Sequence, residues 1–396
     1  MYIEKIEIKK FRVLENMEGV NAIRFQPPSG ITANPVTGNV VNVIAGVNGT
    51  GKTSLLEAIF QAISQPALFF HQKKCGQISI FDFNEVNLDD VPEIYNQLNW
   101  MEVLNKISYL NNTNSDINGF DDQPRLIFMP SQQNFQYSPV TQMAVQYVFA
   151  QKVDIQKILG NAEFYTKEYV LNKILESNIA DPVERTKVAV DAFNSHFLNA
   201  NLLTKLSNLS KTLFNRPVFS NAANQEVTID QLSDGEKQLY GRVIALMILN
   251  PSNSMILIDE PEIALHPAWQ QKIMQIYSRI GRNNQFIVAT HSPQIIASVP
   301  YKNRILLRKE NGKIQPVHMN QPPSGVDVNS ILSEIMGADP RPPELLKLYA
   351  QYRKFVEESK ENTPEALAVK AQLSEESDHS RFMQEMAFLI ELRDAV

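Results

Sequence analysis

The stretch Gly46-Val-Asn-Gly-Thr-Gly-Lys-Thr-Ser54 has the residue types and spacing of a phosphate-binding loop, G-x-x-x-x-G-K-[ST]. It follows the apolar segment 40–45 and precedes the apolar run SLLEAIFQAI. Backbone N–H groups of such a loop converge on phosphate oxygens, and the following helix adds its positive end. We expect Lys52 to reach the β- and γ-phosphates of ATP, with a catalytic role, and Thr53 to hold Mg²⁺. The expected nucleotide-binding residues here are Gly46, Asn48, Gly49, Gly51, Lys52, Thr53 and Ser54.

Two carboxylates follow a second apolar segment, in the order MILI and then Asp259-Glu260. An acidic residue at a strand end is usually structural, but a glycine loop upstream changes that expectation. Asp259 is suited to bind Mg²⁺ through water, and Glu260 is suited to orient and deprotonate the attacking water.

A third motif, Leu-Ser-Asp-Gly-Glu-Lys-Gln at 232–238, permits two interpretations. Ser233 and Glu236 fit a capping box at a helix start. A capping box explains Ser233 and Glu236 but does not explain Gly235 or Gln238. A helix N-terminus with a serine and a glycine can also bind an anion. Capping and phosphate binding can therefore both be true, in different nucleotide states.

The motif LSDGEKQ resembles the signature of ABC-type ATPases, whose heads dimerise with ATP held between the glycine loop of one subunit and the signature of the other. The resemblance implies that Ser233 and Gly235 contact the γ-phosphate bound by the opposite protomer. It also implies an α/β head with a P-loop, a mostly parallel sheet and an antiparallel N-terminal part. We expect ATPase activity with ATP and Mg²⁺, and a homodimer or larger oligomer.

The same resemblance suggests roles for polar residues elsewhere in the chain. His291, in ATHSPQ, would be the switch histidine that contacts the γ-phosphate, and we count it as catalytic. Gln132 or Gln133, after the segment RLIFMP, would sense Mg²⁺ and water, with Gln132 also a metal ligand; the sequence does not separate the two. Arg12, in KKFRV, is either a nucleotide contact or a surface charge.

The phrase IDEPEIALHP at 258–267 resembles the branch that contains RecF, SMC-like proteins and the overcoming-lysogenisation-defect ATPases. The second half of the chain is similar to the ATPase subunits of Septu anti-phage systems, which also occur beside some retrons. This resemblance implies an HNH-type nuclease effector as partner, and in a retron a reverse transcriptase with its RNA–DNA product. No Toprim-like pattern is found in 301–396, so we expect the effector chemistry to lie in that partner.

Two rivals remain. One is a RecF-like repair clamp that binds DNA directly through Lys9, Lys10, Arg12 and a basic group at 302–313. The other is a transporter's nucleotide-binding subunit, which the EPEIALHP phrase disfavours.

Composition narrows the function classes. A net charge of −6 over 396 residues argues against a protein that coats nucleic acid, so any DNA contact should be local. The single cysteine, Cys75, excludes an internal disulfide and a cysteine-rich zinc site. No run approaches the ~18 apolar residues of a membrane span, and we expect a cytoplasmic protein with no membrane contact.

The elements that position these residues are expected to be strands at 2–8, 40–45, 125–130, 255–260 and 285–292, alternating with helices as in a parallel α/β sheet. Strands that could pair as a hairpin are expected at 212–221 and 225–230, and a helix from Pro267 to about 280. The expected parts are ATPase lobe I at 1–63 and 125–140, an insertion at 64–124, a helical layer at 141–205, lobe II at 206–320 and a C-terminal helical tail at 321–396.

Overall fold

The computed structural model describes most of residues 2–64, 125–131, 150–152, 161–197, 202–210, 215–319 and 342–394, together with 328, 331–332 and 336–337. Apart from its first residue, the expected insertion at 64–124 lies outside the described residues, and so do Gln132 and Gln133. None of the described helices is long and apolar enough to cross a membrane.

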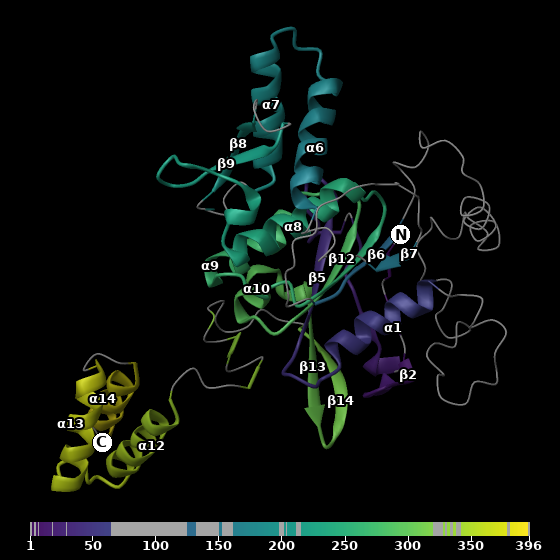
Figure 1. Cartoon of the computed structure of the whole chain (residues 1–396). Coiled ribbons are helices and arrows are strands. Elements are labelled where there is room, and N and C mark those ends of the chain that lie inside the picture. Colours follow the sequence, from purple (N-terminus) through teal and green to yellow (C-terminus); the bar gives the residue numbers. More distant parts are fainter. Residues whose placement is uncertain are drawn as a thin grey trace. The chain divides into compact units, whose positions relative to one another are not determined.

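A seven-stranded sheet forms the centre of the larger unit (Figure 1). All its pairings are parallel except that of the edge strand β14. Four of the inner strands are buried at every residue, because helices cover both faces of a parallel sheet. In spatial order the strands are β14 (Lys313–His318), β13 (Arg304–Glu310), β5 (Val40–Ala45), β12 (Gln285–Thr290), β11 (Met255–Asp259), β6 (Leu126–Met129) and β7 (Ala150–Lys152).

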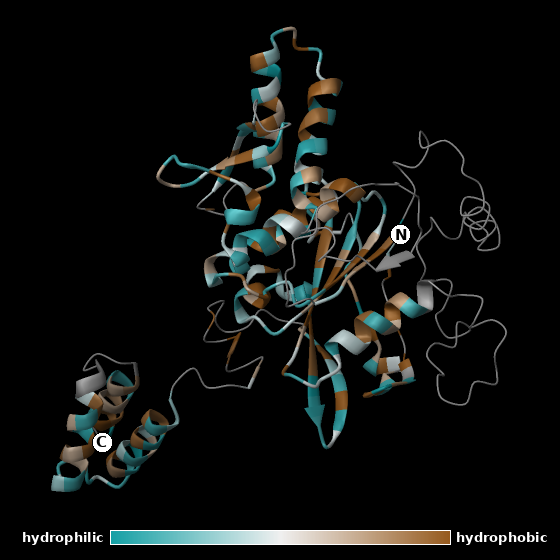
Figure 2. Ribbon diagram, viewed as in Figure 1, coloured by the Kyte–Doolittle hydropathy of each residue, from teal (hydrophilic) through white to brown (hydrophobic). Residues whose placement is uncertain are grey.

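Helix α1 (Lys52–Ser64) packs its apolar side on this sheet. Leu55, Leu56 and Ile59 belong to one buried cluster with Ile44 of β5 and Leu257 of β11. The hydropathy colouring shows the same concentration of apolar residues along the central strands (Figure 2). Each buried aliphatic side chain contributes roughly 1.5–3 kcal/mol, so this layer fixes where the loop before α1 lies. Three further helices adjoin strands of this sheet along the chain. They are α8 (Asp234–Leu249) before β11, α9 (Pro267–Tyr277) between β11 and β12, and α10 (Pro293–Ser298) after β12.

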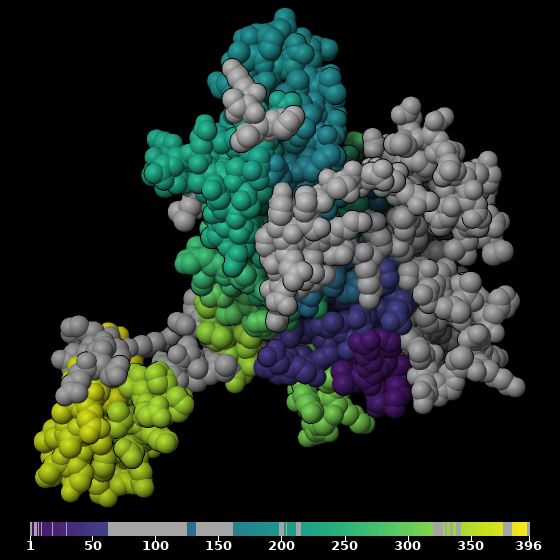
Figure 3. Space-filling view, in the orientation of Figure 1, coloured from purple at the N-terminus to yellow at the C-terminus, as the bar shows by residue number. Residues whose placement is uncertain are grey.

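The N-terminal part is antiparallel, as expected, but the single strand expected at 2–8 is wrong. Two short strands lie here in two different sheets: β1 (Lys5–Ile6) pairs with β4 (Ile23–Arg24), and β2 (Ile8–Phe11) pairs with β3 (Leu14–Met17). Arg12 at φ 55° turns β2 back into the tight hairpin with β3, which the period-2 pattern alone does not signal. After the short η1 (Gly19–Asn21), this part lies against the β13–β14 hairpin (Figure 3). At this contact, His318 Nε2 is 3.2 Å from the Ala22 carbonyl oxygen.

The segment expected as a helical layer contains α6 (Ala162–Glu176) and α7 (Pro182–Ser195), which lie side by side (Figure 1). Asp181 caps α7 through the Val183 N–H, and Pro182 fills its first position. The layer is not purely helical, because β7 within it adds to the sheet edge beside β6. Next along the chain comes a three-stranded antiparallel sheet that includes the expected hairpin: β8 (Lys205–Leu209), β9 (Pro217–Ser220) and β10 (Glu226–Val227), then η4 (Ile229–Gln231).

A second compact unit comprises Leu332–Val396, so the division falls after Ile331 and not after residue 320. Its core joins the three helices described within it through Tyr352, Val356, Leu373, Phe382 and Met386. The rings of Tyr349 and Phe382 stack at 4.0 Å between centroids. The helices are α12 (Pro343–Glu357), α13 (Pro364–Ser377) and α14 (Arg381–Asp394).

In the larger unit, the short η5 (Tyr301–Asn303) directly precedes β13.

Candidate nucleotide-binding and hydrolysis site

The glycine loop connects β5 to α1 at the carboxyl end of the parallel strands. A Cβ on Gly46 would lie 2.8 Å from the Leu307 carbonyl oxygen, and one on Gly51 would lie 2.7 Å from the Leu14 side chain. Gly49 and Gly51 have φ values of 82° and 84°, which side chains rarely adopt. Asn48 and Gly49 are exposed at the loop tip. The sequence therefore needs glycine here both for backbone shape and for packing between β13 and the β2–β3 hairpin.

Lys52 folds back over this loop. Its Nζ donates to the carbonyl oxygens of Gly46 and Val47 over 3.0 and 3.4 Å and lies 3.8 Å from Glu260 Oε1. Only 5% of the Lys52 side chain is exposed, so a buried ammonium is held where the loop closes. Ser54 follows half-buried in the first turn of α1. This arrangement supplies positive charge to an anion seated in the loop.

Thr53 and Asp259 meet between α1 and β11. The Thr53 hydroxyl donates to both Asp259 carboxylate oxygens over 3.0 Å. Burial raises the pKa of Asp259, while hydrogen bonds from Thr53 and Ser131 and the charge of Lys52 act against that rise. A hydroxyl and a carboxylate are the oxygen donors that Mg²⁺ prefers, so this pair fits a magnesium ion.

Glu260 lies in the turn after β11, with φ 46°. Its N–H donates to the Ala289 carbonyl over 2.9 Å, and its own carbonyl accepts from the buried Arg242 guanidinium over 3.2 Å. The Glu260 carboxylate contacts the His291 ring through Oε2 and Nδ1. Burial is the main cause that raises the pKa of Glu260, to about 8, and the neighbouring Glu262 carboxylate adds to it.

Glu262 is a residue of this site that the sequence reasoning missed. Its Oε1 accepts from the Thr290 hydroxyl over 2.5 Å and from the His291 N–H over 2.8 Å, and lies 3.4 Å from His291 Nδ1. The side chain is 5% exposed, whereas that of His291 is 50% exposed. The available signal was the second acid in Glu-Pro-Glu, two positions after Glu260. Glu260, Glu262 and His291 could together hold a metal ion, but the hydrogen bonds already give Glu262 a positioning role.

The motif at 232–238 forms the N-terminus of α8. The capping box is present: Ser233 Oγ accepts from the Glu236 N–H over 3.3 Å, and Glu236 Oε2 accepts from the Ser233 N–H. Glu236 is buried and also accepts from the Thr204 hydroxyl over 2.7 Å. Ser233 itself is exposed, so capping leaves it accessible to a phosphate.

Gly235 has a packing reason that the capping interpretation lacked. A Cβ there would lie 2.7 Å from the Ala264 carbonyl oxygen and 3.0 Å from the Trp269 ring. The motif is thus held against the turn that follows Glu260. Ser233 and Gly235 are positioned by α8 and this turn, not by the glycine loop of their own chain.

Arg12 forms an ion pair with Glu57 of α1 and is 51% exposed. Its guanidinium carbon also lies 5.2 Å from the centre of the Phe11 ring. It therefore lies beside the helix that starts at Lys52. For the candidate glutamines the structure gives only Ser131, the residue before them, whose hydrogen bond reaches Asp259.

The structure thus brings Lys52, Thr53, Asp259, Glu260 and His291 together at the carboxyl ends of β5, β11 and β12. A glycine loop between a parallel strand and a helix, paired acids on a nearby strand, a capped LSDGEKQ helix and a histidine after the next strand define an ABC-type ATPase. The chain belongs to the family described as "AAA domain, putative AbiEii toxin, Type IV TA system", whose model matches residues 78–297.

Curated relatives agree with this class. The chain is 30% identical over 230 residues to the "Retron Ec83 probable ATPase" of Escherichia coli, a match covering 51% of this chain and 41% of that relative's length. It is 22% identical over 389 residues to the Septu protein PtuA of Bacillus thuringiensis, covering 89% of this chain and 90% of PtuA. Among solved structures, an SMC head bound to the C-terminal winged-helix domain of ScpA is 16% identical with a TM-score of 0.42, covering 81% of this chain and 98% of that one.

Proposed function

We propose that this chain is the ATP-hydrolysing subunit of an anti-phage defence complex, in which two copies dimerise around ATP and control a partner effector. The observation that carries the proposal is the convergence of Lys52, Thr53, Asp259, Glu260 and His291, together with an exposed, capped Ser233 on a separate helix. The similarity to PtuA along nearly the whole length of both chains supports the defence setting.

Each residue has a step in the proposed reaction. The loop N–H groups and Lys52 bind the β- and γ-phosphates of ATP, while Thr53 and Asp259 would hold Mg²⁺, which would neutralise charge on the phosphates. Glu260 orients a water in line with the γ-phosphate and takes its proton. The water oxygen bonds to the γ-phosphorus as the bond from that phosphorus to the β-phosphate oxygen breaks, which releases ADP and phosphate. His291, held between Glu260 and Glu262, contacts the γ-phosphate from the adjacent strand. Ser233 and Gly235 of the second copy close the site, and loss of the γ-phosphate loosens the dimer.

The effector is proposed to be an HNH-type nuclease in the cytoplasm, with a reverse transcriptase and its RNA–DNA product in a retron setting. ATP can control such a partner only if the partner binds one nucleotide state more tightly than the other. Purification of the tagged chain expressed with its native neighbouring genes, with ATP or with ADP, tests this. A nuclease bound equally in both states would contradict control by nucleotide.

The alternative is a clamp that binds DNA directly, and three of the charges assigned to it have partners within the protein. Arg304 is 4% exposed and donates to main-chain carbonyls of Val299 and Ala297. Arg12 and Lys10 are in ion pairs with Glu57 and Glu15. These residues already have protein partners.

A mixing experiment tests the shared site. Lys52→Ala removes the phosphate contact, and Ser233→Arg places a long side chain at the exposed signature, so each variant alone is expected to be inactive. A mixed dimer has one of its two sites with both parts intact. An equal mixture should therefore recover about a quarter of the wild-type rate if the copies pair at random, and up to about half if only mixed dimers form. Mixed dimers seen by native mass spectrometry without recovered hydrolysis would contradict a site shared between copies.

A further inference from the structure

In the part of the chain that the structure describes, two arginines are almost fully buried. The exposed fraction is 1% for Arg242 and 4% for Arg304. Moving a cation out of water costs free energy, so a buried arginine needs partners. Both side chains donate to main-chain carbonyl oxygens. They differ in which carbonyl they hold, and this difference points to a role in the reaction for one of them.

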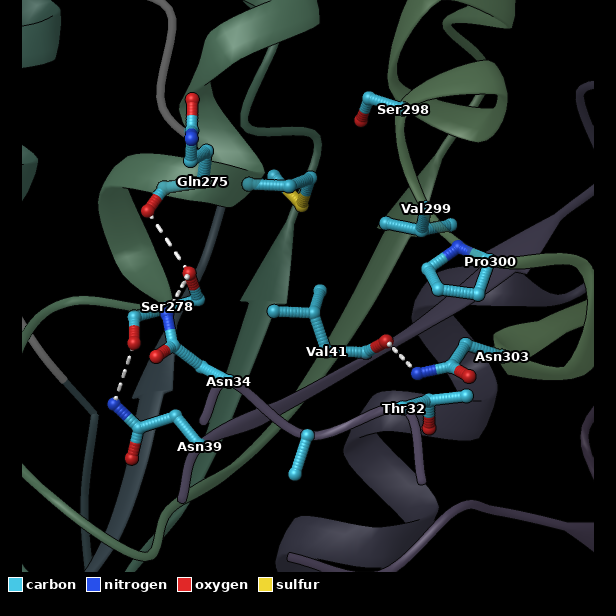
Figure 4. A pocket seen from close by; sticks show the side chains of 12 residues that line it. Thr32, Asn34, Asn39, Val41, Gln275, Ser278, Ser298, Val299, Pro300 and Asn303 are labelled. Carbon is cyan, nitrogen blue, oxygen red and sulfur yellow. Dashed lines mark hydrogen bonds between the residues drawn. The ribbon is translucent and has the colours of Figure 1, made fainter. Parts of the chain in front are cut away.

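Arg304 fixes the backbone at the edge of the sheet that lies away from the nucleotide site. Its Nη2 and Nε donate to the Val299 carbonyl oxygen over 2.8 and 3.0 Å. Val299 lines a cavity of about 220 Å³ together with Asn39 and Val41 at the start of β5 (Figure 4). The glycine loop, in contrast, follows the other end of β5. Arg304 therefore has a structural role and offers a matched control for Arg242.

Arg242 instead holds Glu260, the water-activating residue of the proposed function. Arg242 belongs to α8, and its Nη1 donates to the Glu260 carbonyl oxygen over 3.2 Å. Its Nε and Nη2 have no hydrogen-bond partner among the described residues. An apolar side chain of similar length would fill this place at a lower desolvation cost. What the arginine adds is a fixed donor at the Glu260 carbonyl.

The backbone of Glu260 needs such a donor. Its φ of 46° lies in the left-handed region, which glutamate seldom adopts, and it precedes Pro261, before which extended backbone with negative φ is favoured. A residue persists in this conformation when its surroundings over-determine it. Two anchors do so here, because the Glu260 N–H donates to the Ala289 carbonyl over 2.9 Å while Arg242 holds the Glu260 carbonyl. The peptide groups on both sides of the Glu260 Cα are therefore fixed, and with them the direction in which its side chain leaves the backbone.

The two anchors come from elements that carry other residues of the site. Ala289 lies on β12, which leads to His291, and α8 begins beside Ser233 and Gly235. Ser233 and Arg242 are nine positions apart, ~14 Å along one helix. The Glu260 carbonyl is thus held by the same helix whose N-terminus exposes Ser233.

We propose that Arg242 is a positioning residue for ATP hydrolysis, which aims the Glu260 carboxylate at the attacking water by holding the Glu260 carbonyl from the signature helix. This role rests on the proposed function, in which Glu260 takes the proton of that water. Arg242 acts through Glu260 alone, so ATP binding by the glycine loop and Lys52 does not depend on it.

Arg242→Met tests this role in the full chain, with Arg304→Met as the matched control. For Arg242→Met, kcat should fall about 10- to 100-fold, as expected when a reacting group is misplaced by about 1 Å, while the dissociation constant of a fluorescent ATP analogue stays within about twofold of wild type. Arg304→Met should keep the wild-type kcat when the rate is expressed per molecule that binds the analogue. Arg242→Lys retains a donor of similar reach, so it should hydrolyse ATP at least about threefold faster than Arg242→Met.

Adding Arg242→Met to Glu260→Gln separates positioning from a general structural effect. If Arg242 acts only through the Glu260 carboxylate, the double variant should hydrolyse ATP within about twofold of Glu260→Gln alone in a single turnover. A further tenfold loss, on the order of the effect in the wild-type background, would overturn the role.

The single variants can overturn it as well. An unchanged kcat or a lost affinity for the ATP analogue in Arg242→Met would do so, and so would an equal loss of kcat in Arg304→Met or an Arg242→Lys variant no faster than Arg242→Met. A wild-type chain without ATP hydrolysis, or a Glu260→Gln variant as fast as wild type, would instead contradict the proposed function.

Discussion

Glu262 holds the backbone and the ring of His291 at once. One carboxylate oxygen accepts from the His291 N–H over 2.8 Å and lies 3.4 Å from its Nδ1, while also accepting from the Thr290 hydroxyl. Since the His291 ring is half exposed, few other contacts restrict it. The orientation of the His291 ring toward Glu260 therefore depends on Glu262, a buried acid in the turn after the neighbouring strand β11.

Glu262→Ala should lower kcat for ATP hydrolysis by about 10- to 100-fold, because two donors lose their acceptor at ~1–3 kcal/mol and His291 loses its orientation. Glu262→Gln keeps an acceptor oxygen and should stay within about threefold of wild type if positioning is the dominant role. Steady-state phosphate release measures both variants. Equal losses in the two would show that the negative charge matters and not the hydrogen bonds.

Glu260→Gln should lower hydrolysis by roughly 100- to 10,000-fold, the usual contribution of a general base, while leaving ATP binding intact. We expect this variant to accumulate as an ATP-bound dimer with Mg²⁺, seen by light scattering after size exclusion. Lys52→Ala serves as the matched control, since it should neither bind ATP nor dimerise. A monomeric Glu260→Gln protein with ATP bound would argue against the shared site.

Gly235→Ala should destabilise the larger unit by about 1–3 kcal/mol, because the new methyl group meets the Ala264 carbonyl and the Trp269 ring. Urea unfolding followed by tryptophan fluorescence measures this, since Trp269 is at the contact. Gly30→Ala is the control: its Cβ would come no closer than 3.2 Å to the Pro27 oxygen. If both variants unfold at the same urea concentration, the packing role of Gly235 is wrong.

The C-terminal unit should lose stability in acid, and Glu361 is the carboxylate expected to contribute most. Two hydrogen bonds from Arg393 lower the pKa of Glu361 to about 2. Because this pKa lies below the ordinary value near 4.3, the stabilisation is complete above about pH 4.5 and disappears as pH falls toward 2. Arg393→Ala should cost ~1 kcal/mol at pH 7, reduced by the partial exposure of the arginine, and should flatten this acid dependence.

Hydrogen exchange of α12–α14 in the full chain at pH 7 and pH 3 measures the effect. Arg353→Ala is a suitable comparison, because its ion pair with Glu385 is exposed on both sides. A pH dependence that survives in Arg393→Ala would assign it to other carboxylates.

Local patterns predicted the strands, loop and helix around the candidate nucleotide site where these segments follow one another directly. The segment 40–45, the glycine loop and α1 follow one another directly, and the strand at 255–259 ends at Asp259 as its apolar run requires. The dipeptide Asn311-Gly312 is a further turn signal, and both of its residues have positive φ in the β13–β14 hairpin.

The features that the sequence did not predict depend on contacts with residues far away in the chain or in a second chain. β7 is three residues of Ala-Gln-Lys, whose strand character comes only from pairing with β6. Glu262 is one acid among many until Thr290 and His291, 28 and 29 positions later, donate to it. Ser233 is a third case, since its capping role is local but any phosphate contact requires a second chain.

The packing of Gly235 on the Ala264 carbonyl connects the signature helix of a chain with the turn that carries the same chain's Glu260. In the proposed assembly, the signature of each chain completes the site of its partner, while Ala264 lies in the turn directly after that chain's own Glu260. A shift of the signature when the partner releases phosphate is therefore transmitted through one backbone contact to the other water-activating carboxylate. Through this contact, the position of one chain's Glu260 turn would become sensitive to the nucleotide held with its partner.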